Sequence, residues 1–190
     1  HFVYQQNGSG NPLGYCADMA DQVNDPFSWK PGYEYVTTLN SYKETGLTYT
    51  LLRNENDFYL YSYRISYRFG VLKQLMVKMD NVIDLDKAEF FGASNVLSVI
   101  YYTVGNKLYG YDFAKKKCEL LKTFDGYEIT MLLSDILVET SGDYFYVGLY
   151  DSSKTASTGG IIKKFKIVDD VNNIIIKEEK GSEWKNLCKV

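Results

Sequence analysis

The chain has 190 residues, of which 45% are hydrophobic and 16% aromatic, enough for the core of one domain and too few for two ordinary ones. Its formal net charge of −3 provides no large positive field, so nucleic acid is not expected as a partner. No apolar run approaches the roughly 20 residues of a membrane-spanning helix, and no signal segment precedes the first strand, so we expect either a cytosolic protein or a targeting segment outside this sequence.

Near the N-terminus, residues 15–27 show the spacing of a short helix. Cys16, Met19, Ala20 and Val23 follow the i, i+3, i+4, i+7 pattern of an amphipathic helix. We expect one short helix or a long ordered loop in this part of the chain.

Strands are expected from residue 33 onward. The chain contains 18 Tyr and 10 Phe, which are favoured in β-sheets, and only 3 Pro, which interrupts them. Residues 33–41 give the first strand. A layout of apolar run, turn and aromatic run then appears three times, at 48–65, 96–113 and 144–168. In the third copy a longer Ser/Thr/Gly loop, residues 151–160, separates the two strands, and we expect it to be mobile or to point outward.

The copies align with one another. Sliding the first over the second without a gap places Leu60 on Leu108, and Ile162 takes the corresponding place in the third. We therefore expect these three residues at equivalent inner-strand positions of successive units.

Further strands flank each copy, so each unit has about four strands. The flanking strands are expected at 72–80, 87–94, 117–125, 128–137 and 172–180. Four-stranded units repeated every 40 to 50 residues are typical of a β-propeller. The expected fold is therefore all-β: a propeller-like array of four-stranded antiparallel blades, forming either a closed or an incomplete ring, in a single domain spanning 1–190. A β-sandwich is the competing fold.

The C-terminal segment 184–190 is expected to form a strand beside residues 2–6, because closed propellers often build one blade from both chain ends. Strand alternation would place Trp184 on one face and Leu187 on the other. Closure of this kind would bring Leu187 next to Val3.

The chain also resembles a known family. The run "DKAEFFGASNVLSVIYYTVGNKLYGYDFAKKKCELLKTFDGYEITMLLSD", with "YTLLRNENDFYLYSYRI" before it and "YFYVGLYD" and "GGIIKKFKI" after it, is similar to the C-terminal, propeller-like part of the PKD-like family of Bacteroidetes lipoproteins. The resemblance covers roughly residues 33–190 and implies an exported, lipid-anchored envelope protein with immunoglobulin-like modules before a propeller-like domain. It also implies a role beside outer-membrane nutrient uptake, with this chain a fragment of the longer protein.

Catalytic chemistry has few candidates. The single histidine is His1, so Ser-His-Asp and Cys-His catalysis are not expected. Asp84 and Asp86 would share one face of a strand, and glycoside hydrolysis needs only two carboxylates. Solvated acids at a strand start are the simpler interpretation, and no catalytic residue is predicted.

Metal and phosphate sites are not expected either. Asp18, Asp21 and Asp25 offer oxygen ligands for Ca²⁺, but their spacing matches no EF-hand loop and fits a solvated helix face. Gly159 and Gly160 lack the strand-turn-helix context of a phosphate loop. The three cysteines, Cys16, Cys118 and Cys188, lie too far apart in sequence to outline a zinc site or a disulfide framework.

An aromatic patch is the best candidate for a binding site. Trp29, Tyr33 and Tyr35 surround a Pro-Gly pair in a loop-rich stretch, and saccharide sites use such rings for stacking. The alternative is that these rings plug one end of the fold.

We therefore expect a non-enzymatic binding or interaction module of the cell envelope, anchored at the outer membrane and either periplasmic or surface-exposed. The expected partners are a saccharide or peptide ligand and outer-membrane uptake proteins, with no cofactor. The alternative is a carbohydrate-active enzyme that uses paired carboxylates. Two facing acids in a pocket would favour the enzyme, and a shallow aromatic surface would favour the binding module.

Overall fold

The computed structural model describes residues 2–6, 12–16, 27–28, 33–40, 47–66, 70–94, 98–134, 143–168, 170 and 172–189. The chain divides into two compact units, His1–Met79 and Asp80–Val190. Each unit is described below by itself.

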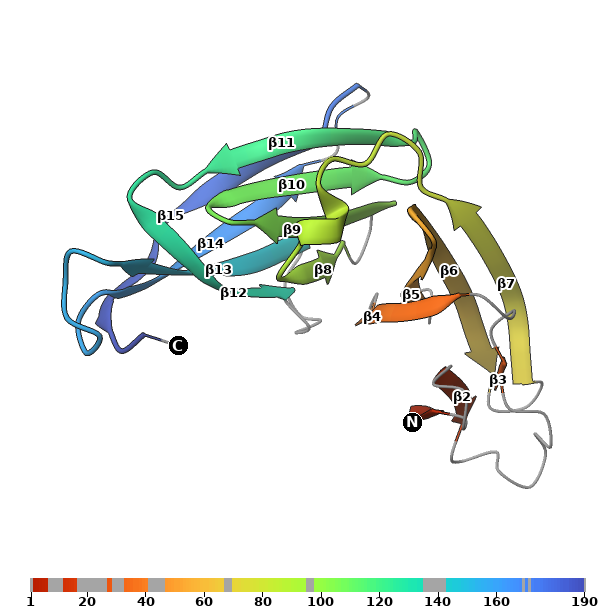
Figure 1. Ribbon diagram of the computed structural model, residues 1–190. Coiled ribbons are helices and arrows are strands. Elements are labelled where there is room, and N and C mark those ends of the chain that lie inside the picture. The colour runs from red at the N-terminus through yellow and green to blue at the C-terminus, as the bar shows by residue number, and fades with distance from the viewer. Residues whose placement is uncertain are drawn as a thin grey trace. The chain divides into compact units, whose positions relative to one another are not determined.

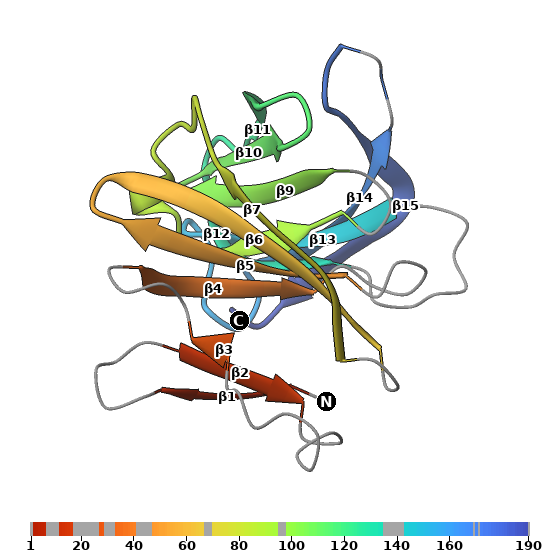
Figure 2. The ribbon, with the colours of Figure 1, turned by 90° about the vertical axis from the view of Figure 1, so that its right-hand side faces the viewer.

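The first unit contains two antiparallel sheets. Three strands form the smaller sheet: β1 (Phe2–Gln6), β2 (Pro12–Cys16) and β3 (Phe27–Ser28). Four strands, which follow one another across the sheet in chain order (Figure 2), form the larger: β4 (Glu34–Asn40), β5 (Leu47–Asn54), β6 (Asp57–Ser66) and β7 (Gly70–Lys78).

The second unit contains two four-stranded antiparallel sheets, again with strands adjacent in chain order (Figure 1). A single 3₁₀ turn, η2 (Leu85–Lys87), precedes them. The first sheet consists of β8 (Phe91–Ala93), β9 (Val99–Val104), β10 (Lys107–Asp112) and β11 (Lys117–Thr123). The second consists of β12 (Tyr127–Ser134), β13 (Asp143–Asp151), β14 (Gly160–Val168) and β15 (Ile175–Leu187).

The all-β fold class is thus confirmed, with three four-stranded antiparallel sheets among the described residues. Each strand expected from residue 33 onward has a counterpart at nearly the expected position. Cys16, expected to lie in a short helix or a long ordered loop, instead ends strand β2. Met19, Ala20 and Val23 lie outside the described residues, so the expectation for 17–26 stays a prediction.

Leu60, Leu108 and Ile162 lie on β6, β10 and β14, the third strand of each four-stranded sheet. Leu60 and Leu108 are both buried. Ile162 is half-buried and lies on the opposite face of its sheet from the fully buried Phe165. The expected equivalence is therefore confirmed for the strand that each residue occupies.

The register of the repeat differs from the ungapped alignment. Asn54 pairs with Asp57 at the first hairpin turn, and Val104 pairs with Lys107 at the second, an offset of 50 residues (from 54 to 104). The alignment of Leu60 with Leu108 is therefore two residues out of register. Because side chains alternate with a period of two, such a shift keeps every residue on its own face, so the error left the predicted faces unchanged.

In the second unit, sheet β12–β15 packs face to face on sheet β8–β11 (Figure 1). The Tyr101 ring lies 4.7 Å from the Phe145 ring, Phe145 stacks on Phe165 at 5.4 Å, and Phe124 meets Phe165 edge-on at 6.0 Å. Burying a side chain of this size stabilises the fold by about 1.5–3 kcal/mol. The buried residues that share this core are Tyr101, Leu108, Phe124, Ile129, Leu132, Phe145, Val147, Leu149, Ile161, Phe165 and Ile167.

A polar link joins the first strands of these two sheets. At the end of β12, the Ser134 hydroxyl donates to the Ala93 carbonyl at 3.2 Å and accepts from the Ala93 amide at 3.3 Å. The same oxygen lies within hydrogen-bond distance of the Tyr101 hydroxyl. The link satisfies polar groups that burial would otherwise leave without a partner, and it fixes β12 beside β8.

The other face of sheet β8–β11 is covered in part by the segment that precedes it. The Tyr102 hydroxyl donates to the Ile83 carbonyl at 2.7 Å and lies 3.1 Å from the Cys118 sulfur. Tyr102 also stacks on Tyr109, with ring centroids 5.5 Å apart. Leu85 of η2 is buried. Strand β9 therefore buries both of its faces, as its apolar sequence requires.

The loop between β13 and β14 is held by local hydrogen bonds. The Asp151 carboxylate accepts from the amide and the hydroxyl of Ser153 at 3.0 and 2.6 Å. Residues 152–158 are exposed, so the expectation of an outward loop between two strands of one sheet is confirmed. Its mobility stays a prediction.

The C-terminal strand belongs to a different sheet from the one expected. Leu187 pairs with Gly160 of β14, whereas Val3 pairs with Tyr15 of β2. The expected pairing of Leu187 with Val3 is therefore wrong. The reason is the length of β15, which begins at Ile175 and continues along β14 almost to the end of the chain, so its last residues have a partner.

The core position of Phe145 gives a test of the stacked sheets. Phe145→Ala removes a fully buried ring between Tyr101 and Phe165, so it should lower the free energy of unfolding by about 3–5 kcal/mol. Leu133→Ala, on the opposite face of the same sheet and 48% exposed, should cost about 1 kcal/mol or less. Chemical denaturation measures both. Equal losses would contradict this assignment of faces.

Two buried tyrosines form a second matched pair. Tyr102→Phe leaves the Ile83 carbonyl without its donor and should cost about 1–3 kcal/mol. The Tyr111 hydroxyl is buried without a hydrogen-bond partner among the described residues, so Tyr111→Phe should be neutral or stabilising. Thermal and chemical denaturation compare the two variants, and a larger loss for Tyr111→Phe would contradict the prediction.

The same residue predicts a response to alkaline pH. Burial raises the pKa of Tyr111 to about 12, above the 10.0 of an exposed tyrosine, and outweighs the opposing effect of the Asp80 backbone. Because the folded-state pKa is the higher one, this contribution to stability is complete below pH 10 and is lost as the pH rises through 12. Tyr111→Phe should therefore lose less stability than the wild type between these two pH values.

Candidate functional site

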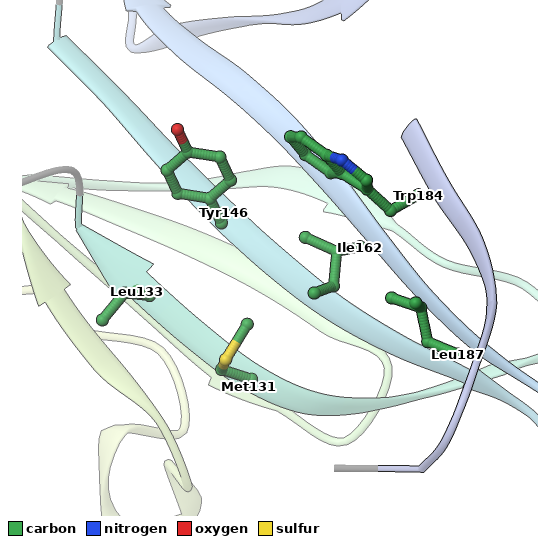
Figure 3. A pocket seen from close by; sticks show the side chains of 6 residues that line it. All are labelled: Met131, Leu133, Tyr146, Ile162, Trp184 and Leu187. Carbon is green, nitrogen blue, oxygen red and sulfur yellow. The ribbon is translucent and has the colours of Figure 1, made fainter. Parts of the chain in front are cut away.

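The outward face of sheet β12–β15, opposite the stacked core, carries an apolar hollow of about 400 Å³. We call this surface the open face. Figure 3 shows the six side chains projecting from the four strands around the hollow. They are Met131, Leu133, Tyr146, Ile162, Trp184 and Leu187.

Pairing of the strands explains why these residues meet. Met131 pairs with Gly148, Gly148 with Ile162, and Ile162 with Trp184, so one row crosses all four strands. Residues directly opposite one another in antiparallel strands share a face. The next row begins with Leu133 and Tyr146.

Gly148 contributes no side chain to the middle of this row. A Cβ at this position would lie 2.9 Å from the Met131 Cβ, because a bulge between Ile129 and Met131 brings β12 close to β13. A side chain at this position would therefore collide with β12, so the close approach of β12 and β13 requires a glycine here.

Two large apolar side chains of the open face remain in contact with solvent. Trp184 is 47% exposed and Leu133 is 48% exposed. The Trp184 ring lies 6.1 Å from the Tyr146 ring at an angle of 47°, which orients both rings toward the hollow. By contrast Phe145 and Val147, which alternate with Tyr146 along β13, are completely buried.

Lysines flank the hollow on the third strand. Lys164 pairs with Tyr146, and Lys166 pairs with Tyr144 on one side and with Lys177 on the other. The Lys164 ammonium lies 4.1 Å from the centre of the Tyr144 ring and 5.6 Å from that of Tyr146. Cation–π contacts of this kind hold the charge at the rim.

The opposite side of β14 has a different charge arrangement. Lys163 lies 2.9 Å from Glu178 and 3.3 Å from Glu183. Partial burial alone would lower the pKa of Lys163, but hydrogen bonds to these two carboxylates raise it above its ordinary value overall. Glu178 and Glu183 of β15 are thus both paired with a lysine.

Sequence reasoning missed the open face because of one backbone angle. Simple alternation would put Trp184 and Leu187 on opposite faces, but both line the hollow. Asn186 between them adopts a φ of 55°, in the left-handed region, which changes the direction of the strand. The available signal was in β13, where the sequence "YFYVGLY" is apolar at every position and therefore predicts two apolar faces.

The aromatic patch predicted from the sequence is only partly described. Tyr33 packs edge-on against the Tyr59 ring at 5.1 Å. Tyr35 on β4 is 39% exposed, and its hydroxyl donates to Thr38 at 3.2 Å. Trp29 lies outside the described residues. The ligand-binding role of these three aromatic residues stays a prediction.

The acidic candidates have a different setting from the one expected. Asp84 and Asp86 were expected on one strand face, but Asp84 precedes the 3₁₀ turn η2 with a φ of 49°, and Asp86 lies within that turn. Asp84 accepts a hydrogen bond from Lys87 at 2.6 Å. The expectation of a shared strand face is therefore wrong, because the chain turns at this point.

Other expected ligands cannot be placed. Asp18, Asp21 and Asp25 lie outside the described residues. In the part of the chain that the structure describes, no three His, Cys, Asp or Glu side chains gather closely enough to hold a metal ion. The same part contains no helix of the length and apolarity needed to cross a membrane.

The chain matches no protein-family model, no curated protein and no solved structure.

The exposure of Trp184 gives a direct test of the open face. In a Trp29→Phe variant, in which Trp184 is the remaining tryptophan, acrylamide should quench the fluorescence of the folded protein to roughly half the extent seen after denaturation, given its 47% exposure. The denatured variant serves as the reference for full exposure. Fluorescence that resists quenching would show that Trp184 is covered.

Proposed function

We propose that this protein is a non-enzymatic binding and interaction module, and that the open face of sheet β12–β15 is its contact surface. The observation that carries the proposal is the difference between the two faces of one sheet. One face buries Phe145 and Phe165 almost completely, and the other leaves Trp184 and Leu133 about half exposed around a hollow. Large exposed apolar groups that gather in one place are typical of interaction sites.

The residues around the hollow are of the kinds that line binding sites. Binding sites are generally concave and mostly apolar, with a few polar groups at the edge that determine orientation. The hollow has apolar walls, a tryptophan at one side and lysines at the rim. Tryptophan is among the residues that contribute most strongly to binding energy at interfaces.

We propose further that the four-stranded sheets are blades of an incomplete propeller-like array. Within the second unit, consecutive sheets stack face to face, each has its strands in chain order, and Ser134 links the first strand of one to the first strand of the other. These are the features of neighbouring blades. In such an array the open face is the side of sheet β12–β15 turned away from its neighbouring blade β8–β11.

The cellular setting follows from the family resemblance. It supports a lipid-anchored protein of the cell envelope that assists nutrient uptake at the outer membrane, with a glycan or a peptide as the ligand. The hollow supplies the surface for such a contact, and the resemblance supplies the setting. Both remain parts of the proposal.

Glycan and peptide arrays test the proposed function. The wild-type protein should bind a subset of the immobilised ligands, and Trp184→Ala should weaken that binding by about tenfold or more, as expected for a central aromatic residue. Leu120→Ala is the control, because Leu120 is 51% exposed on β11, outside the hollow. Binding that is equally strong in all three proteins would exclude the open face as the contact surface.

A further inference from the structure

We propose that the partner of the open face is a separate acidic polypeptide, which inserts one large apolar side chain into the hollow and places carboxylates beside Lys164, Lys166 and Lys177. This inference rests on the proposed function and specifies the chemistry of the partner. It follows from the lining of the hollow, the unpaired lysines beside it and the contrast with the covered face of the neighbouring sheet.

The lining of the hollow favours an apolar side chain over a sugar. Four of its six residues are aliphatic or thioether side chains: Met131, Leu133, Ile162 and Leu187. A sugar ring would bring hydroxyl groups that need hydrogen-bond partners, and burying a hydroxyl group without one is costly. A Phe, Leu or Met side chain instead gains free energy from such a surface.

The lysines supply the charge. Lys164, Lys166 and Lys177 lie on the open face in adjacent rows, and none of them forms an ion pair with a described carboxylate. Glu178 lies 2.9 Å from Lys163 instead. Glu183 lies close to Lys163 and Lys185.

At the other end of the hollow, the lysine forms an ion pair with a carboxylate. Beyond Leu187, Lys189 lies 2.7 Å from Glu128 and 4.6 Å from the centre of the Tyr150 ring. Lys164, Lys166 and Lys177 therefore lie on the flank of the hollow away from Lys189. A partner with carboxylates on one side of its apolar side chain complements this arrangement, which gives both orientation and specificity.

The same lysines argue against a permanently packed sheet on this face. On the covered face of sheet β8–β11, Tyr101 pairs with Gly110, and a Cβ at Gly110 would lie 3.0 Å from Ile174, so the space is filled by apolar atoms. On the open face, Tyr146 pairs instead with Lys164. Burying such an ammonium permanently without a carboxylate would cost several kcal/mol, so an exchangeable acidic partner fits better than another blade.

Short synthetic peptides test the inference. Each carries one central Phe, flanked on one side by Asp residues, by Asn residues at the same positions, or by Lys residues. Fluorescence anisotropy of the labelled peptides against the wild-type protein should give about tenfold tighter binding for the Asp peptide than for the Asn peptide. The advantage should disappear as salt rises from about 0.05 to 0.5 M. A version with Ala in place of Phe should bind more weakly.

Two charge-reversal variants locate the contact. Lys166→Glu should abolish the preference for the Asp peptide, whereas Lys107→Glu, an exposed lysine on the third strand of the neighbouring sheet, should leave it unchanged. Circular dichroism and the melting temperature show that each variant is folded. Ile162→Asp, which places a carboxylate in the hollow, should weaken binding of every Phe peptide.

The peptide and oligosaccharide measurements distinguish an acidic partner from the alternative ligands. Equal binding of the Asp and Asn peptides overturns the acidic partner but leaves the interaction surface intact. Oligosaccharides that bind in a Trp184-dependent manner, where the peptides do not, overturn the inference and support a glycan ligand for the same face. Failure of every peptide to bind overturns the inference, while the arrays decide the proposed function independently.

Discussion

The stacking of aromatic rings between sheets β8–β11 and β12–β15 is the contact on which the second unit depends. Tyr101, Phe145 and Phe165 form a continuous column with centroid separations of 4.7 and 5.4 Å. Side chains that point toward this column are buried, and side chains on the opposite side of sheet β12–β15 are partly exposed to solvent. The open face exists because β13 and β14 are held by the core on one side only.

A sheet that is apolar on both faces either buries its second face inside the protein or leaves that face exposed, where it can contact a partner. Strand β9 buries both, since Tyr101 lies in the stacked core and Tyr102 lies under the segment around Ile83. Strand β13 has the same kind of sequence, but only its Phe145 side is buried. This difference between two strands of similar composition makes a contact role for the remaining face physically reasonable.

The sequence predicts the fold of this protein better than it predicts the site. The alternation in β9, β10 and β13, and the turns between strands, are local features, so the strand positions and the four-stranded units could be predicted well. The open face includes a bulge opposite Gly148 and the left-handed conformation of Asn186, which are determined by the pairing of distant strands. Neither feature has a reliable signal in a single sequence, so Trp184 and Leu187 were expected on opposite faces.

The ends of β14 and β15 are tied together in a way that bears on mechanical resistance. The Lys189 amide donates to the Ala156 carbonyl of the β13–β14 loop at 2.6 Å, and its ammonium lies 2.7 Å from Glu128 of β12, so the residue just after β15 is joined to that loop and to the first strand of the sheet. Force applied at the C-terminus would separate β15 from β14 one ladder bond at a time, beginning with these contacts. The Leu187 side of the hollow would therefore be the first part of the open face to be lost under tension, and a ligand held there would be released before the aromatic column yields.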